Sequence, residues 1–160
     1  MKSVCFTGHR EVKETDTIRY LLDKVLTDLI EKGVTDFYAG GALGWDMLCE
    51  KAVLNLREEF PHIRLNLILP CPPEIQIAKW NSSERSEYFR IYTASDSVKI
   101  LSDTYYDGCM KKRNQALVEL SEICVCYCTR FRSGTGQTVR MAEKNNLTII
   151  NIADNPEILP

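Results

Sequence analysis

The feature that most constrains this chain is a regular alternation between short apolar runs and longer segments with helical periodicity. The runs are β-prone and bounded by glycine, proline or polar turn residues, which is typical of buried strands. Strands that alternate with helices require right-handed crossovers and therefore form a parallel sheet. We predict an α/β, Rossmann-like fold: a doubly wound, mainly parallel sheet of about six strands with helices on both faces. The predicted strands are residues 3–7, 34–39, 64–69, 97–101, 123–128 and 147–152.

The segments between the runs carry apolar residues at the spacing of amphipathic helices. The clearest helix starts at Thr15 or Asp16, either of which can cap it, and stops at Gly33. The connection between the third and fourth strands is expected to be irregular and partly helical. The other predicted helices cover about residues 43–60, 108–120 and 138–145.

No linker, internal repeat or low-complexity tract divides the chain. We therefore expect a single Rossmann-like domain over residues 1–154, followed by a C-terminal tail at 155–160 that frays from it.

The composition excludes several classes of protein. The chain is 44% apolar and 26% charged, and no apolar run approaches the ~18 residues that span a bilayer, so no membrane partner is expected. A net charge of -2 gives no general attraction for a polyanion, which makes nucleic acid a poor candidate partner. The seven cysteines fit reduced thiols, and the N-terminus lacks a secretory signal, so a cytoplasmic location is expected.

Three predicted strands end in glycine-containing turns. Because the carboxyl ends of parallel strands meet at one edge of the sheet, these turns are expected to lie together and to bind an anionic ligand there. The residues predicted to bind this ligand are Gly8, His9, Arg10, Gly40, Gly41, Gly44, Asp46, Ser133, Gly134, Thr135, Gly136 and Thr138.

The third of these turns, at residues 133–138, is the preferred phosphate cradle. Its two glycines let the backbone approach closely, and the hydroxyls of Ser133, Thr135 and Thr138 add donors. Asp46 would repel a phosphate, so a sugar hydroxyl or a base is its expected partner. The strict dinucleotide and P-loop fingerprints are absent, which sets aside classical dehydrogenases and P-loop enzymes.

Two other features have competing interpretations. Cys124, Cys126 and Cys128 alternate along a predicted strand, with successive Cα atoms about 6.6 Å apart, which suits one tetrahedral zinc poorly and favours buried structural thiols. No metal site and no required cofactor are therefore expected. Trp80 either stacks a base or covers the core, together with the tyrosines that follow it.

Four segments, in this order, resemble the YpsA-like branch of the SLOG superfamily: Phe-Thr-Gly-His-Arg at 6–10, Gly-Gly-Ala-Leu-Gly-Trp-Asp at 40–46, Lys-Arg-Asn at 112–114 and Ser-Gly-Thr-Gly at 133–136. The resemblance adds Arg113 and Asn114 to the predicted ligand-binding residues. It implies a Rossmann-like fold, a homodimer, and binding of a nucleotide derivative such as ADP-ribose, a dinucleotide or a mononucleotide, in a sensor or signalling role.

The same superfamily includes nucleoside-monophosphate phosphoribohydrolases and proteins that process single-stranded DNA. The hydrolases carry M-H-x-R-K and P-G-G-x-G-T-x-x-E motifs, and this chain keeps Met110 and Arg113 but has no acid at positions 138–140. A non-catalytic or weakly catalytic binder is therefore preferred. The runner-up is a nucleotide N-glycosidase that uses Arg113 with Glu119 or Asp46, and the third class is a single-stranded nucleic-acid binder.

Overall fold

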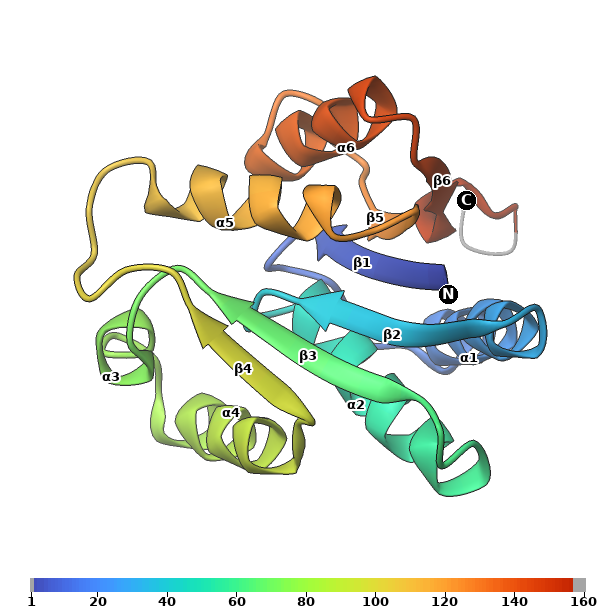
Figure 1. Ribbon diagram of the computed structural model, residues 1–160, viewed down its shortest axis with the longest axis horizontal. Coiled ribbons are helices and arrows are strands. Elements are labelled where there is room, and N and C mark those ends of the chain that lie inside the picture. The colour runs from blue at the N-terminus through green and yellow to red at the C-terminus, as the bar shows by residue number, and fades with distance from the viewer. Residues whose placement is uncertain (1, 157–160) are drawn as a thin grey trace.

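The computed structural model describes residues 2–156 and contains a six-stranded sheet whose neighbouring strands all pair in parallel. The spatial order is β4-β3-β2-β1-β5-β6 (Figure 1). This confirms the predicted Rossmann-like architecture, and each strand boundary lies within one residue of its predicted position. The strands are β1 (Lys2–Gly8), β2 (Val34–Ala39), β3 (Arg64–Leu69), β4 (Ser97–Ile100), β5 (Ile123–Tyr127) and β6 (Thr148–Asn151).

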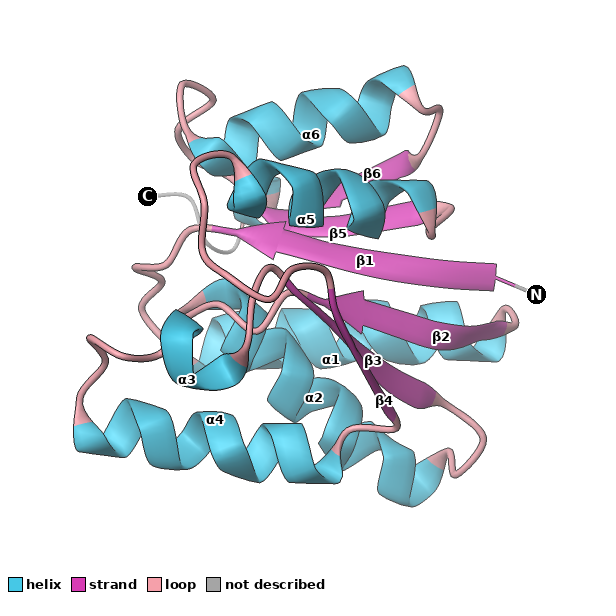
Figure 2. Cartoon of the chain, turned by 60° about the vertical axis from the view of Figure 1, so that its left-hand side comes forward, coloured by secondary structure: helices cyan, strands magenta, loops and turns pink. Residues whose placement is uncertain are grey.

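Helices cover both faces of the sheet. One face carries α1, α2 and α4, and the opposite face carries α5 and α6 (Figures 1 and 2). This arrangement explains why the central strands are apolar runs rather than alternating sequences. The helices are α1 (Asp16–Glu31), α2 (Trp45–Glu59), α3 (Pro73–Gln76), α4 (Ser82–Ala94), α5 (Cys109–Glu119) and α6 (Gly134–Lys144), with a short 3-10 helix, η1 (Ile152–Asp154).

Local capping signals fix several helix starts. Thr15 caps α1 by accepting a hydrogen bond from the N–H of Ile18 at 3.2 Å, as its position before the apolar repeat predicts. Asn81 and Glu84 form a reciprocal capping box that starts α4. The connection expected to be irregular and partly helical thus contains two helices, α3 and α4. Most of the tail expected at 155–160 lies outside the described residues.

The core has two parts, one on each face of the sheet. The larger part contains Phe6 and Phe37 from the sheet together with apolar side chains of α1 and α2, including Trp45. The smaller part contains Cys5, Cys124, Cys126 and Cys128 beneath α5 and α6, together with Leu117 and Val139 from those helices. Hydrogen bonds with Cys126 and Cys5, together with burial, raise the pKa of the Cys124 thiol. The alternating cysteines are therefore packed as small apolar core residues. Over residues 2–156, no helix is both long and apolar enough to cross a membrane.

Candidate functional site

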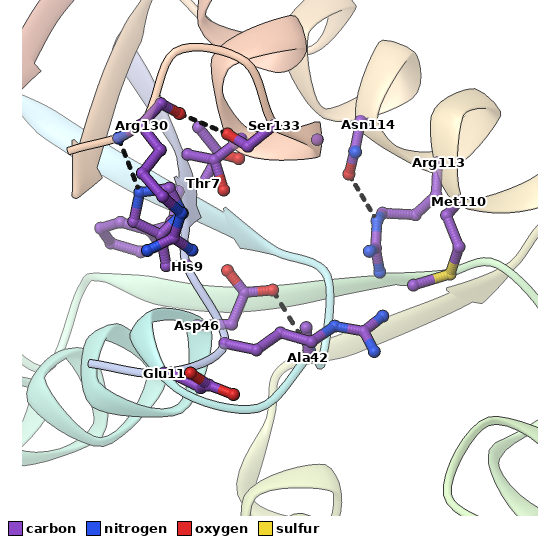
Figure 3. Close-up of a pocket in the computed structure, with 15 residues that line it drawn as sticks. Thr7, His9, Glu11, Ala42, Asp46, Met110, Arg113, Asn114, Arg130 and Ser133 are labelled. Atoms are coloured by element: carbon purple, nitrogen blue, oxygen red, sulfur yellow. Dashed lines mark hydrogen bonds between the residues drawn. The ribbon is translucent and has the colours of Figure 1, made fainter. Parts of the chain in front are cut away.

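A cavity of about 390 Å³ opens at the carboxyl ends of β1 and β5. In open α/β sheets the crevice beside the strand at which the order reverses is the usual ligand site, and β1 holds that position here. The cavity lies between the segment after β1, the start of α2, the start of α5 and the β5–α6 connection (Figure 3). It brings together, from the predicted ligand-binding residues, Gly8, His9, Arg10, Asp46, Arg113, Asn114, Ser133, Gly134 and Thr135.

The predicted phosphate loop at 133–138 is in fact the start of α6, which begins at Gly134 and not at Thr138. The reason is the cap: Ser133 Oγ accepts a hydrogen bond from the N–H of Gly136 at 3.1 Å and donates to the carbonyl of Arg130. Thr138 is buried, and its hydroxyl donates to the carbonyl of Gly134 at 3.0 Å. Among the described residues, the N–H groups of Gly134 and Thr135 have no partner, and both residues line the cavity.

Five of the six predicted glycines face other parts of the protein and not open space; Gly40 faces Arg113 and Gly41 faces Leu69. A Cβ atom on Gly8 would overlap the Trp45 side chain, and one on Gly136 would overlap the Phe131 carbonyl. Gly44 has a φ of +77°, and a Cβ there would overlap the carbonyl of Arg10. These glycines let segments of the chain pack closely and thereby shape the cavity walls. Gly134 differs, because a Cβ there would meet no atom within 4 Å.

The loop after β2 is held by two carboxylates one turn apart on α2. The N–H of Ala42 donates to Asp46 Oδ2 and the N–H of Gly41 donates to Glu50 Oε2, each at 3.2 Å. Glu50 is only 1% exposed. The predicted residues Gly40, Gly41 and Gly44 do not line the cavity; they belong to the loop that Asp46 and Glu50 hold in place.

Arg113 supports the same loop from the other face of the sheet. Its Nη1 donates to the carbonyl of Gly40, and its Nε donates to Asn114 Oδ1 at 2.9 Å. Arg113 is 4% exposed, and burial lowers the pKa of its guanidinium while the charge of Asp46 opposes that change. Burial likewise raises the pKa of Asp46, against the positive charge of Arg113. Asp46 and Arg113 thus form a buried, oppositely charged couple on two walls of the cavity.

His9, which follows β1, forms hydrogen bonds with the β5–α6 connection. Its Nε2 accepts hydrogen bonds from the N–H groups of Thr129 at 2.9 Å and Arg130 at 3.3 Å (Figure 3). Burial lowers the pKa of His9, and the nearby Arg130 charge acts in the same direction. The imidazole is therefore neutral near pH 7, and its Nε2 is occupied by backbone donors.

The cavity has a polar, mixed charge distribution that suits an asymmetric ligand. Arg10 and Arg130 are exposed cationic side chains that line it, and the N-terminus of α6 adds a positive partial charge. Asp46 supplies a buried carboxylate on the opposite wall (Figure 3). An anionic group can therefore bind at α6 while a hydroxyl or amino group donates to Asp46.

Glu119, one of the two acids considered for hydrolysis, lies elsewhere. It is the exposed last residue of α5 and accepts a hydrogen bond from Gln115 at 3.1 Å. Arg113 lies about 9 Å away along the helix axis. Glu119 borders a different hollow with Lys2 and Asp36 at the amino-terminal edge of the sheet. Of the two predicted acids, only Asp46 lines the cavity.

The predicted ligand-binding set omits seven residues of the site. Six of them line the cavity beside predicted residues, and Glu50 supports it from behind. The six are Phe6, Thr7, Glu11, Ala42, Met110 and Arg130. The signal for Glu50 was its spacing, because a residue four positions after Asp46 lies on the same side of the helix.

Glu50→Gln is expected to flatten the pH dependence of stability. Burial and the negative charge of Asp46 raise the pKa of Glu50 well above its ordinary value of 4.5. A carboxyl with a raised pKa contributes stability at low pH, and this contribution is lost as the pH rises through the folded-state pKa. The free energy of unfolding of the wild type should therefore fall as the pH rises above about 4.5, while the variant, which still offers an oxygen to Gly41, should lose less.

Urea unfolding of both proteins between about pH 5 and 8 measures this difference. Besides Asp46, the charged or titratable groups that interact with Glu50 are Arg113, Tyr88 and Cys49, and all three are retained in the variant. Glu119→Gln is the matched control, because Glu119 is exposed. Parallel wild-type and Glu50→Gln profiles would contradict the prediction.

Comparison with protein families places the chain in a defined group. A sequence profile of the YpsA family, described as the YspA SLOG family, matches residues 5–153. A UPF0398 protein from Halalkalibacterium halodurans is 29% identical over 107 residues, covering 66% of this chain and 56% of that protein. The uncharacterized SPbeta prophage-derived protein YoqJ of Bacillus subtilis is 28% identical over 148 residues, covering 82% of this chain and 85% of YoqJ. The chain therefore spans little more than half of the Halalkalibacterium relative.

Solved structures with the same fold include two DNA processing proteins. DNA processing protein A from Helicobacter pylori, described for its single-stranded DNA binding mode, has a TM-score of 0.64 at 18% identity and matches 92% of this chain and 63% of its own. The Streptococcus pneumoniae protein has a TM-score of 0.65 at 15% identity and matches 92% of this chain and 49% of its own. At these identities the likeness establishes the fold alone.

Proposed function

Because the chain belongs to the YpsA SLOG family, we propose that it binds a phosphate-bearing nucleotide derivative in the cavity beside β1 and β5. One observation carries the proposal: the unpaired N–H groups at the start of α6 and the side chains of Arg10 and Arg130 line the same cavity as the buried carboxylate of Asp46.

The α6 side of the cavity suits the phosphate. The N–H groups of Gly134 and Thr135 are free to donate, and the helix dipole favours a negative charge there. Arg130 and Arg10 can add charge-assisted hydrogen bonds. Ser133 already caps the helix, so its role is to hold the two N–H groups in place rather than to contact the phosphate.

The opposite wall suits a ribose. A carboxylate is an acceptor for sugar hydroxyls, and Asp46 is oriented by a hydrogen bond from the N–H of Ala42. Arg113 is engaged by Gly40 and Asn114, so its contribution is the charge that offsets Asp46. The two walls together therefore suit the sugar-phosphate part of a nucleotide, with the phosphate at α6 and the ribose at Asp46.

The N-glycosidase remains the runner-up, because Asp46 is a buried carboxyl beside a buried arginine in the cavity. Binding is preferred over hydrolysis because Asp46 already serves the loop before α2, and no acid stands at positions 138–140. A single-stranded DNA ligand is the second alternative, because the Helicobacter pylori protein with the same fold binds single-stranded DNA.

In a panel of ligands, ADP-ribose, dinucleotides or mononucleotides are expected to raise the melting temperature of the protein. At a ligand concentration of 100 times Kd, the free energy of unfolding should increase by about 2.7 kcal/mol. Arg130→Ala should weaken the binding about 10-fold or more, because a charge-assisted hydrogen bond is lost while the backbone bonds of residue 130 remain. Arg132→Ala is the matched control, since Arg132 is exposed and does not line the cavity.

Ligand binding, base release and oligonucleotide binding together separate the alternatives. No response to any nucleotide would overturn the proposal. Release of free base from nucleoside monophosphates, detected by chromatography and abolished in Asp46→Asn, would establish the N-glycosidase. Tight oligonucleotide binding with no response to mononucleotides or ADP-ribose would favour the DNA-binding alternative.

A further inference from the structure

A second cavity, of about 620 Å³, adjoins the first and shares Arg10, Ala42 and Met110 with it. We propose that the base of the ligand binds in this second cavity against Trp80, and that the ligand is a nucleoside diphosphate derivative long enough to occupy both cavities. This inference rests on the proposed function and extends it by naming the class of nucleotide.

The two cavities differ in chemistry. The first is lined by charged side chains and backbone donors, as described above. The second is lined mainly by apolar and aromatic residues, including Pro70, Ile75, Trp80 and Tyr105. A nucleotide has the same division, with a flat, largely apolar base at one end and charged phosphates at the other.

Trp80 packs against an aromatic side chain, Tyr88, that is itself held in place by hydrogen bonds. Tyr88 packs against it edge-on, with ring centroids 5.5 Å apart and an interplanar angle of 85°. Tyr88 is itself held by a hydrogen bond from its hydroxyl to Gln76 at 3.3 Å, and Gln76 donates to the carbonyls of Gly40 and Gly41. Trp80 is half-buried and lines the cavity, so part of its side chain is accessible to a base.

Arg10 determines the class of ligand. It lines both cavities, so a ligand running from Trp80 to the start of α6 passes this guanidinium. A diphosphate bridge places negative charge at that junction and can be bound bidentately. Each cavity lies within the usual ~300–1,000 Å³ range of ligand sites, and a ligand with groups at both ends, such as ADP-ribose, makes use of both.

Intrinsic fluorescence gives a direct test, because the chain has two tryptophans and Trp45 is fully buried beside Tyr127. ADP-ribose is expected to change the Trp80 emission, and the change should vanish in Trp80→Phe.

The affinity of variants gives a second test. Trp80→Ala should weaken ADP-ribose binding about 10-fold or more, whereas Trp80→Phe, which retains a stacking face, should lose much less affinity. Ribose 5-phosphate, which has no base, should bind wild type and Trp80→Ala equally. Tyr20→Ala, an exposed change on α1, is the control.

The outcomes separate this inference from the function on which it rests. ADP-ribose binding that depends on Arg130 but is unchanged in Trp80→Ala would overturn the inference and leave the proposed function standing. Binding of AMP without binding of ADP-ribose would do the same. Absence of any nucleotide binding would overturn both. If Trp80→Ala fails to fold, the emission change in the wild type and its loss in Trp80→Phe decide the question.

Discussion

Replacing Arg113 with methionine is expected to lower the free energy of unfolding by about 3 to 5 kcal/mol. Methionine fills a similar volume without charge, so the buried carboxyls of Asp46 and Glu50 lose the arginine charge that opposes the rise of their pKa values. The carbonyl of Gly40 also loses its donor. Removal of one partner from a buried ion pair lowers the free energy of unfolding by more than the intact pair adds to it, because the remaining charge is left buried without a partner.

Urea unfolding measures the effect, and two variants test its cause. Arg113→Met combined with Asp46→Asn should recover part of the loss, since the asparagine carries no charge and can still accept from Ala42. Lys111→Met, an exposed change on the same helix, should alter stability by no more than about 0.5 kcal/mol. An Arg113→Met protein as stable as the wild type would contradict the prediction.

The fold was predictable from the sequence because its determinants are local. The apolar run at β3 is bounded by proline, and Thr15 precedes a helical repeat, so strand and helix positions follow from patterns within a few residues. The capping box of α4, Asn81 and Glu84, is equally local, and α4 lies in the connection that the sequence predicts to be irregular and partly helical. The early start of α6 was missed because Ser133 was assigned to a glycine loop and not to an N-cap.

The sequence predicts where the candidate site lies on the sheet, but not the role of each residue in it. Parallel topology brings the ends of β1, β2 and β5 to one edge, so the three glycine turns had to converge. Which glycines approach a ligand depends on tertiary packing, and Gly8 against Trp45 cannot be inferred from spacing. Glu119 shows the same limit: it is near Arg113 in sequence, but its helix position places it at the far end of α5.

Gly136→Ala is expected to destabilise the protein by about 2 to 3 kcal/mol, although alanine is the better helix former. The added methyl group would overlap the carbonyl oxygen and the Cα of Phe131, which are backbone atoms that cannot move aside as a flexible side chain can. The connection that carries Phe131 also holds Ser133, whose hydroxyl caps the N–H of Gly136. Displacement of this connection would therefore weaken the cap as well as the packing.

Gly134→Ala is the matched control two residues earlier on the same helix. A Cβ at Gly134 would meet no atom within 4 Å, and its φ is not in the left-handed region, so the substitution should be neutral or stabilising by up to about 1 kcal/mol. Thermal and urea unfolding of the two variants measure the difference. Equal stabilities would contradict the close packing of α6 on the Phe131 backbone. A stable Gly134→Ala protein that no longer binds ADP-ribose would indicate that the phosphate occupies the space beside Gly134. The glycine would then be needed for the ligand and not for the backbone conformation.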